Sequence, residues 1–176
     1  SSCVAGLKEA AVRAGVSPAV VSRALDGVQP DEKVLRLSKV QPEFKTPIWD
    51  YFGFLIDEQR VSDGRAMMRK YDGVLRAAEQ RFGVSRFVIA AVWGVETDYG
   101  REAGDSFLPQ ALATLACQGG RRTAFWRGEL IAALHLVDRG DLELNELYGS
   151  WAGAFGQTQF IPSTYQRLAV DFDGDG

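Results

Sequence analysis

Residues 86–100, with the sequence RFVIAAVWGVETDYG, decide the fold class. From Phe87 to Val95 every residue is apolar or glycine, and Ser85 offers a side-chain oxygen that caps the start of a helix. A helix that is apolar on all sides is normally buried. The stretch therefore predicts a buried helix, and Glu96, which follows it directly, is expected to lie in apolar surroundings.

Other segments also carry the spacing of helices, and no window alternates cleanly between apolar and polar residues. Steps of three and four residues predict one helix that ends at Gly83 and another that ends near Gly140. Ser17 and Pro18 begin a short helix that Gly27 closes. Residues 41–57, with two prolines and five aromatic residues, instead predict an extended segment laid over a core. The fold class is mainly α, with few or no strands.

The composition is that of an ordinary globular protein, with 46% hydrophobic and 24% charged residues among 176. A net charge of -3 and the lack of any Lys/Arg-rich run exclude a general nucleic-acid binder. No apolar run reaches the ~20 residues of a membrane span, so no transmembrane segment is expected. Cys3 continues an apolar helix face, so we interpret it as a helix residue. The alternative is that Cys3 carries a lipid. The sequence does not decide whether Cys3 and Cys117 form a single disulfide.

Glu96 is the first candidate for chemistry. A carboxyl group in an apolar site loses hydration when it ionises, so its pKa rises and it can act as a general acid. The alternative from spacing alone is a glutamate at a helix end that turns outward to water. Asp98 is a nearby rival acid, and Asp105 is a looser one on a loop.

The segment YGSWAGAFGQTQFIPSTYQ, residues 148–166, is too rich in glycine for a stable helix and too apolar for a disordered linker. An ordered loop that lines a cleft fits best, with Pro162 and Ser163 opening another helix. Sugar-binding grooves combine flat apolar side chains with amide and hydroxyl groups. This segment supplies both, in Trp151, Phe155, Gln157, Gln159, Phe160 and Tyr165. Ordinary core packing is the alternative.

These motifs resemble a known family when taken together. GVETDYG, ALATLA, GGRRTAFWRGEL, GSWAGAFGQTQFIPSTYQ and AVDFDGDG occur in the order seen in lytic murein transglycosylases of the membrane-bound lytic transglycosylase B type. The resemblance runs from about Trp49 to the C-terminus and more weakly through the N-terminal helices. It implies a lysozyme-like helical core with an additional N-terminal helical region.

The resemblance also implies an activity. The family cleaves the β-1,4 bond between N-acetylmuramic acid and N-acetylglucosamine in peptidoglycan without water, and it leaves a 1,6-anhydro ring. Its one catalytic carboxylate matches Glu96, and no cofactor is required for catalysis. Groove residues of the family match Ser150, Gln159, Arg121 and Arg122. We also expect Tyr99, Phe155, Gln157 and Phe160 to bind substrate, although Phe155 and Gln157 stand where Met and Tyr or His are common.

The end of the chain, DFDGDG, begins an EF-hand pattern. Asp171, Asp173 and Asp175 fall at ligand positions one, three and five, and Gly176 falls at position six. The acidic residue needed at position twelve lies beyond Gly176, so only half of the loop is present. A structural calcium ion is therefore expected only if the loop is completed.

The expected domains are an N-terminal helical region with the aromatic segment, residues 1–60, and a lysozyme-like catalytic core, residues 61–176. The expected partners are peptidoglycan glycan strands, in the periplasm or at the outer membrane of a bacterial envelope, and a lipid anchor stays open. Two alternatives remain. One is a hydrolytic muramidase that uses a second carboxylate, and the other is a non-catalytic peptidoglycan-binding module.

Overall fold

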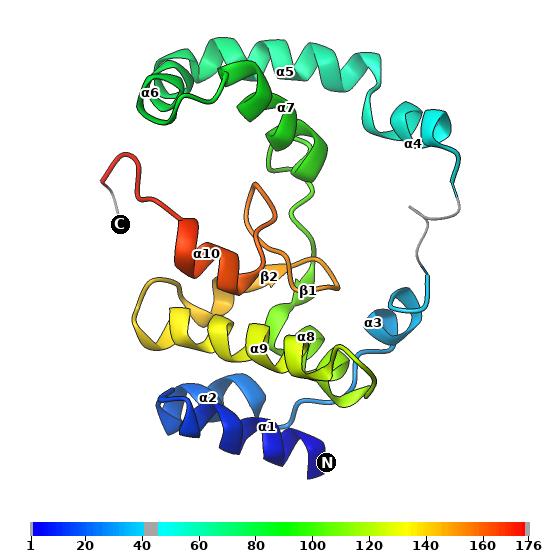
Figure 1. Cartoon of the computed structure of the whole chain (residues 1–176), viewed down its shortest axis with the longest axis vertical. Coiled ribbons are helices and arrows are strands. Elements are labelled where there is room, and N and C mark those ends of the chain that lie inside the picture. Colours follow the sequence, from blue (N-terminus) through cyan, green and yellow to red (C-terminus); the bar gives the residue numbers. More distant parts are fainter. Residues whose placement is uncertain (1, 41–45, 175–176) are drawn as a thin grey trace. The chain divides into compact units, whose positions relative to one another are not determined.

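The computed structural model describes residues 2–40 and 46–174 (Figure 1). These residues form ten α-helices and a two-stranded antiparallel sheet in which Ser106 pairs with Gly149. The elements are α1 (Ser2–Arg13), α2 (Pro18–Leu25), α3 (Glu32–Leu37), α4 (Ile48–Leu55), α5 (Glu58–Lys70), α6 (Asp72–Phe82), α7 (Arg86–Thr97), β1 (Ser106–Phe107), α8 (Leu108–Cys117), α9 (Thr123–Asp138), β2 (Tyr148–Gly149) and α10 (Pro162–Leu168). The mainly α class and the scarcity of strands are therefore confirmed.

The chain divides into two compact units. Unit 1 comprises Ser1–Val40, Gly104–Phe155 and Phe160–Gly176, and unit 2 comprises Gln41–Ala103 and Gly156–Gln159. Each unit thus draws on stretches that are far apart in the sequence, and no boundary falls at residue 60. The domains 1–60 and 61–176 stay a prediction.

Unit 1 holds a continuous hydrophobic core between α8 and α9, which lie side by side with α1 and α2 packed against them (Figure 1). Leucines fill its centre because α8 and α9 present apolar residues at helical spacing to each other. Those with no exposed surface are Leu25, Leu108, Leu112, Leu130, Leu134, Leu136 and Leu147. A fully buried leucine stabilises a fold by about 2 kcal/mol or more, so this cluster is the main source of stability in unit 1.

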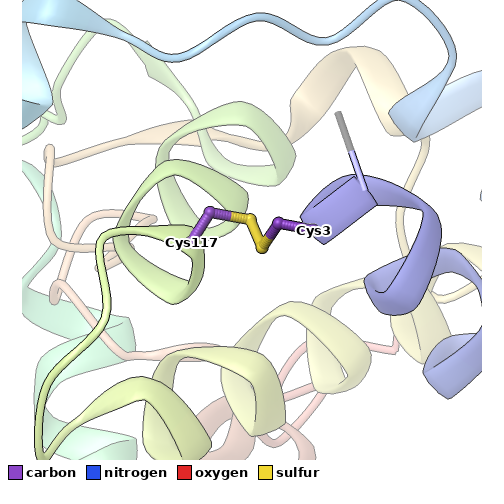
Figure 2. Close-up of a disulfide and its surroundings, with 2 residues drawn as sticks. All are labelled: Cys3 and Cys117. Atoms are coloured by element: carbon purple, nitrogen blue, oxygen red, sulfur yellow. A yellow bond between two sulfur atoms is a disulfide. The ribbon is translucent and has the colours of Figure 1, made fainter.

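A disulfide joins Cys3 in α1 to Cys117 at the end of α8 (Figure 2). The bond spans 114 residues of sequence, and the two Cα atoms lie 5.9 Å apart. It fixes the N-terminal helix to the central helix pair of unit 1. The sulfur of Cys3 is therefore occupied by a cysteine partner, and the interpretation of Cys3 as a helix residue is confirmed.

Unit 2 has a much thinner core, built where α7 packs on α5 and α6. Only Ala90, Gly94 and Thr97 of α7 are buried. Phe87, at 60% exposed, and other large apolar side chains of α7 face outward. The prediction that the whole helix is buried is wrong, because two neighbouring helices cover only one of its faces.

Two further predictions in unit 2 need correction. Residues Ile48–Leu55 form the helix α4 with no buried residue, not an extended segment over a core, and Trp49 is 80% exposed. The first part of that segment, residues 41–45, lies outside the described residues. The single helix that steps of three and four residues predict before Gly83, beginning at Met67, is divided at Tyr71, which separates α5 from α6. Its end at Gly83 is confirmed by a left-handed φ of 69°.

Among the described residues, no helix is both long enough and apolar enough to cross a membrane.

Candidate active site

Glu96 lies in the last turn of α7, and the structure leaves its side chain exposed. The expectation of enclosing apolar surroundings is therefore wrong for this chain. The physical reason is again the single covered face of α7, since Val92 and Val95 beside Glu96 are 44% and 40% exposed. Within residues 2–40 and 46–174, no hydrogen bond or ion pair engages the Glu96 carboxylate.

The helix ends directly after this carboxylate because two consecutive residues are left-handed. Asp98 has a φ of 50° and Tyr99 a φ of 59°. The N–H of Asp98 still donates to the oxygen of Gly94 at 3.0 Å, and that of Tyr99 donates to the oxygen of Trp93 at 3.3 Å. Such bonds satisfy the last carbonyls of a helix. Glu96 therefore lies in a helical turn whose C-terminal end has a defined conformation.

Tyr99 turns back beneath α7 and is only 9% exposed. Its hydroxyl donates to the carbonyl oxygen of Arg60 at 2.9 Å, and its ring meets the ring of Trp93 edge-on with centroids 5.5 Å apart. Burial raises the pKa of this phenol. Its role in substrate binding stays a prediction, because the structure uses both its ring and its hydroxyl to support α7.

The rival acid Asp98 belongs to an ion-pair network. Arg101 donates to both of its carboxylate oxygens at 2.9 Å and also reaches Asp63, while Arg60 lies 3.7 Å from Asp98. These hydrogen bonds from Arg101 hold the pKa of Asp98 and of Asp63 below the usual range. A carboxylate held ionised by arginines is poorly suited to donate a proton near neutral pH.

The second rival, Asp105, belongs to unit 1. Its carboxylate pairs with Lys33 at 2.5 Å, and this hydrogen bond lowers its pKa. Asp105 is thus also held ionised, so Glu96 is the better general-acid candidate of the three.

The loop Gly156–Gln159 belongs to unit 2 and packs against α7. The indole N–H of Trp93 donates to Oε1 of Gln157 at 2.6 Å, and the hydroxyl of Thr97 donates to the main-chain oxygen of Gln157 at 2.8 Å. Nε2 of Gln159 donates to the carbonyl oxygens of Ala103 at 3.0 Å and Gly156 at 2.9 Å. Both glutamines therefore make hydrogen bonds that hold the loop within unit 2. Substrate binding by either glutamine stays a prediction.

The remaining groove candidates of the glycine-rich segment belong to unit 1. Oγ of Ser150 accepts the N–H of Ala154 at 3.0 Å, which leaves its hydroxyl proton available to another acceptor. Phe155 is 5% exposed and packs on the ring of Tyr165, while Phe160 is half-buried. Phe155 and Phe160 exchange main-chain hydrogen bonds of 2.9 and 3.1 Å. This pair closes the base of the loop, and α10 begins at Pro162 as expected.

Arg121 and Arg122 precede α9 in unit 1, and both are exposed. The guanidinium of Arg122 lies over the rings of Phe125 and Trp126, 4.8 and 4.6 Å from their centroids. In the described part of the chain no carboxylate pairs with either arginine. Their guanidinium groups are thus open to an anionic ligand, although this role stays a prediction.

The structure describes only part of the aspartate-rich end, up to Gly174. Oδ1 of Asp171 accepts the N–H of Gly174 at 2.9 Å, as at the start of a turn. Asp175 lies outside the described residues, and those residues contain no group of three or more His, Cys, Asp or Glu side chains suited to a metal ion. The calcium site expected from Asp171, Asp173 and Asp175 therefore stays a prediction, and no chemistry is assigned to a metal here.

Sequence reasoning missed the residues that hold these candidates in place. At the end of α7, its own residues Trp93 and Thr97 bond to Gln157, and Arg60 and Arg101 pair with Asp98. In unit 1, Glu129 anchors α10 through Ser163. The only available signal was that Trp93 and Thr97 are four residues apart and so share a helix face. Nothing in the sequence named Gln157 as their partner.

Comparison with known proteins gives a consistent answer. The family described as Transglycosylase SLT domain matches residues 1–176. The membrane-bound lytic murein transglycosylase B of Escherichia coli K12 is 42% identical over 122 residues, which cover 69% of this chain and 34% of that protein.

Solved structures agree. SltB3 from Pseudomonas aeruginosa in complex with NAG-anhNAM-pentapeptide is 40% identical with a TM-score of 0.91, and the match covers 98% of this chain and 46% of that one. The E. coli lytic transglycosylase Slt35 in complex with calcium is 31% identical with a TM-score of 0.87, covering 99% and 56%. This chain therefore spans between about a third and just over half of the length of these relatives. The predicted lysozyme-like helical fold is confirmed, and the chain belongs to the Transglycosylase SLT domain family.

Proposed function

We propose that this chain carries the catalytic carboxylate, Glu96, of a peptidoglycan lytic transglycosylase. The reaction is cleavage of the β-1,4 bond between N-acetylmuramic acid and N-acetylglucosamine with formation of a 1,6-anhydro end. The observation that carries the assignment is the contrast between three acids. Asp98 and Asp105 are held ionised by Arg101 and Lys33, whereas no cation pairs with Glu96 among the described residues.

One carboxylate is sufficient when the substrate supplies the nucleophile. Protonated Glu96 donates its proton to the glycosidic oxygen, and the bond between that oxygen and C1 of the muramic acid breaks. The 6-hydroxyl of the same sugar then attacks C1, and its proton passes to the Glu96 carboxylate. One C–O bond has broken, one has formed, no water is consumed, and Glu96 regains its starting state. Glycosidases that use water need a second carboxylate.

The exposure of Glu96 fits this role if the glycan itself excludes water. Val92, one turn before Glu96 on the same helix face, and the adjacent Val95 present exposed apolar surface near the carboxyl group. A sugar ring lying on this surface would displace water from Glu96, and loss of hydration disfavours the ionised form of a carboxyl.

Other residues that match the family keep polar groups that can bind sugar hydroxyls or carboxylates. Oε1 of Gln159 and the hydroxyl proton of Ser150 are available for sugar hydroxyls, because the bonds described above use only their other hydrogen-bonding groups. Arg121 and Arg122 are suited to the carboxylates of the lactyl group or the stem peptide. The relative SltB3 has a solved complex with NAG-anhNAM-pentapeptide, which contains an anhydro sugar and a peptide.

The proposed location is the periplasm or the outer-membrane surface of a bacterial envelope. The disulfide between Cys3 and Cys117 supports it, because structural disulfides persist in oxidising compartments. The E. coli relative carries the name membrane-bound. Because Cys3 is bonded to Cys117, its sulfur does not carry a lipid in this structure.

Digestion of purified sacculi tests the assignment by mass spectrometry of the released muropeptides. Wild type, Asp98→Asn and Asp105→Asn are expected to release anhydro-muropeptides, and Glu96→Gln is expected to release none. Asparagine tolerates the left-handed conformation of Asp98, so that variant tests the acid without straining the backbone. Turnover that survives Glu96→Gln refutes the catalytic assignment. Products with reducing ends favour the muramidase, and glycan binding without any turnover favours the binding module.

A further inference from the structure

We propose that Gln157 is a positioning residue, which sets the place of Glu96 by holding the last turn of α7 and does not itself contact the glycan. The inference rests on the proposed role of Glu96. It revises the expectation that Gln157 binds substrate, and it assigns a function to a position where the family commonly has Tyr or His.

Gln157 accepts one hydrogen bond on each side of Glu96. Oε1 of Gln157 takes the indole N–H of Trp93, three residues before Glu96, at 2.6 Å. Its main-chain oxygen takes the hydroxyl of Thr97, one residue after Glu96, at 2.8 Å. Residues 93 and 97 are four apart and share one helix face. The loop therefore packs on the face of α7 that carries Trp93 and Thr97, and it leaves the carboxylate of Glu96 uncovered.

Both donors are held in place beside Gln157. Thr97 is 1% exposed, and its Oγ1 accepts the N–H of Gly100 at 2.9 Å. The same hydroxyl lies 3.3 Å from the main-chain oxygen of Trp93, which is farther than the oxygen of Gln157 at 2.8 Å. The ring of Trp93 is fixed edge-on between Tyr71 and Tyr99, with centroids 5.5 Å away on each side. The Thr97 contact is thus part of the buried turn, and the more exposed Trp93 contact is held in place by the two neighbouring rings.

The loop that presents Gln157 is itself fixed. Nε2 of Gln159 binds the carbonyl oxygens of Gly156 and Ala103, and Gln159 adopts a left-handed φ of 54°. Gly100 lies so close that a Cβ there would come within 2.7 Å of Oε1 of Gln157. The close approach of Gly100 restricts the side chain of Gln157 to a defined position. Because the loop is fixed, its hydrogen bonds restrain the turn that carries Glu96.

A positioning role and a glycan contact predict different kinetics. An acid misplaced by about 1 Å can lose up to roughly a hundredfold in rate, because proton transfer needs a defined geometry. Loss of a glycan contact that is equal in the ground state and the transition state raises KM instead. We expect Gln157→Leu to lower kcat on soluble glycan strands at least about tenfold and to leave KM unchanged.

Four comparisons make the test specific. Trp93→Phe removes the same hydrogen bond from the other side, so the double variant Trp93→Phe/Gln157→Leu is expected to be no slower than the slower single variant. Gln157→Glu keeps an acceptor oxygen for the indole and is expected to restore most of kcat. Gln166→Leu is the matched control, because Gln166 donates to the oxygen of Ala132 in unit 1. Glu96→Gln reports on the proposed function in the same assay.

An activity-independent measurement separates the two hypotheses. In hydrogen-exchange NMR, Gln157→Leu is expected to speed exchange of the Trp93 indole proton and of the amides of Asp98 and Gly100, whereas Gln166→Leu leaves them unchanged. Unchanged exchange in Gln157→Leu overturns the positioning role, as does a raised KM with unchanged kcat or failure of Gln157→Glu to restore kcat. Turnover that persists in Glu96→Gln overturns the proposed function, even where the exchange result confirms that Gln157 holds the turn.

Discussion

The carboxylate of Glu129 accepts both hydrogens that Ser163 can donate. The main-chain N–H of Ser163 lies 2.9 Å from Oε2, and its hydroxyl oxygen lies 2.6 Å from Oε1. Glu129 belongs to α9 and is 5% exposed, whereas Ser163 lies in the first turn of α10. A buried acid of one helix thus satisfies one of the unpaired N–H groups at the start of another.

We therefore expect Glu129→Ala to lower the free energy of unfolding by about 1.5–3 kcal/mol, the range for hydrogen bonds to a charged group. Ser163→Ala, which removes only the hydroxyl, should cost about 1 kcal/mol. Urea unfolding of both variants measures the difference. Equal and negligible losses would show that α10 does not depend on Glu129.

Two glycines of unit 2 should respond to alanine in opposite directions. A Cβ on Gly94 would lie 2.6 Å from Cζ of Tyr99, whereas a Cβ on Gly73 in α6 meets nothing within 4 Å. Gly94→Ala is expected to destabilise by about 1–3 kcal/mol through this overlap. Gly73→Ala is expected to stabilise by about 0.5–1 kcal/mol, because alanine is the better helix former. Thermal unfolding that ranks the two variants the other way would contradict the described packing of Tyr99.

Stability should fall in acid partly through Asp63 and Asp98. Arg101 lowers the pKa of both carboxyls in the folded chain. Their stabilising contribution is therefore present above the unfolded pKa of about 4 and is lost as the pH falls through the lower folded values. Arg101→Leu should raise both pKa values, as carboxyl NMR titration would measure, and should flatten the loss of stability below about pH 4. Unchanged titration curves would rule out the ion-pair network.

The disulfide should contribute measurably to the stability of unit 1. A native disulfide is worth about 2–5 kcal/mol, and a long closed loop favours the upper part of that range. The double variant Cys3→Ser/Cys117→Ser should accordingly unfold at lower urea concentration than wild type. Arg13→Ala, an exposed change in the same helix, is the matched control. Alkylation of both cysteines in unreduced native protein would contradict the pairing.

Helix signals in the sequence were reliable where the determinants are local. Ser17 and Ser85 cap α2 and α7, and Gly83 ends α6 in a left-handed conformation. These features depend on one side chain or one backbone angle. The mainly α class follows from the same spacing, and the family followed from motifs that no spacing argument could supply.

The sequence could not decide which helix faces are buried in the folded chain. The apolar run of α7 predicted enclosure, but the burial of a helix depends on how many neighbours reach it. Only α5, α6 and the loop Gly156–Gln159 pack on α7 within unit 2, and its other face stays exposed. The same limit explains α4, whose aromatic residues stay exposed. The support around Glu96 was also unpredictable, because Gln157 lies about sixty residues from Trp93 and Thr97 in sequence.

The most direct test of the central claim is digestion of purified sacculi in water enriched in oxygen-18, with the products analysed by mass spectrometry. A single carboxylate that uses the substrate's own 6-hydroxyl predicts anhydro-muramyl products without oxygen-18, formed by wild type and absent with Glu96→Gln. Muramic acid ends that carry one oxygen-18 atom would show that water is the nucleophile and would contradict the account.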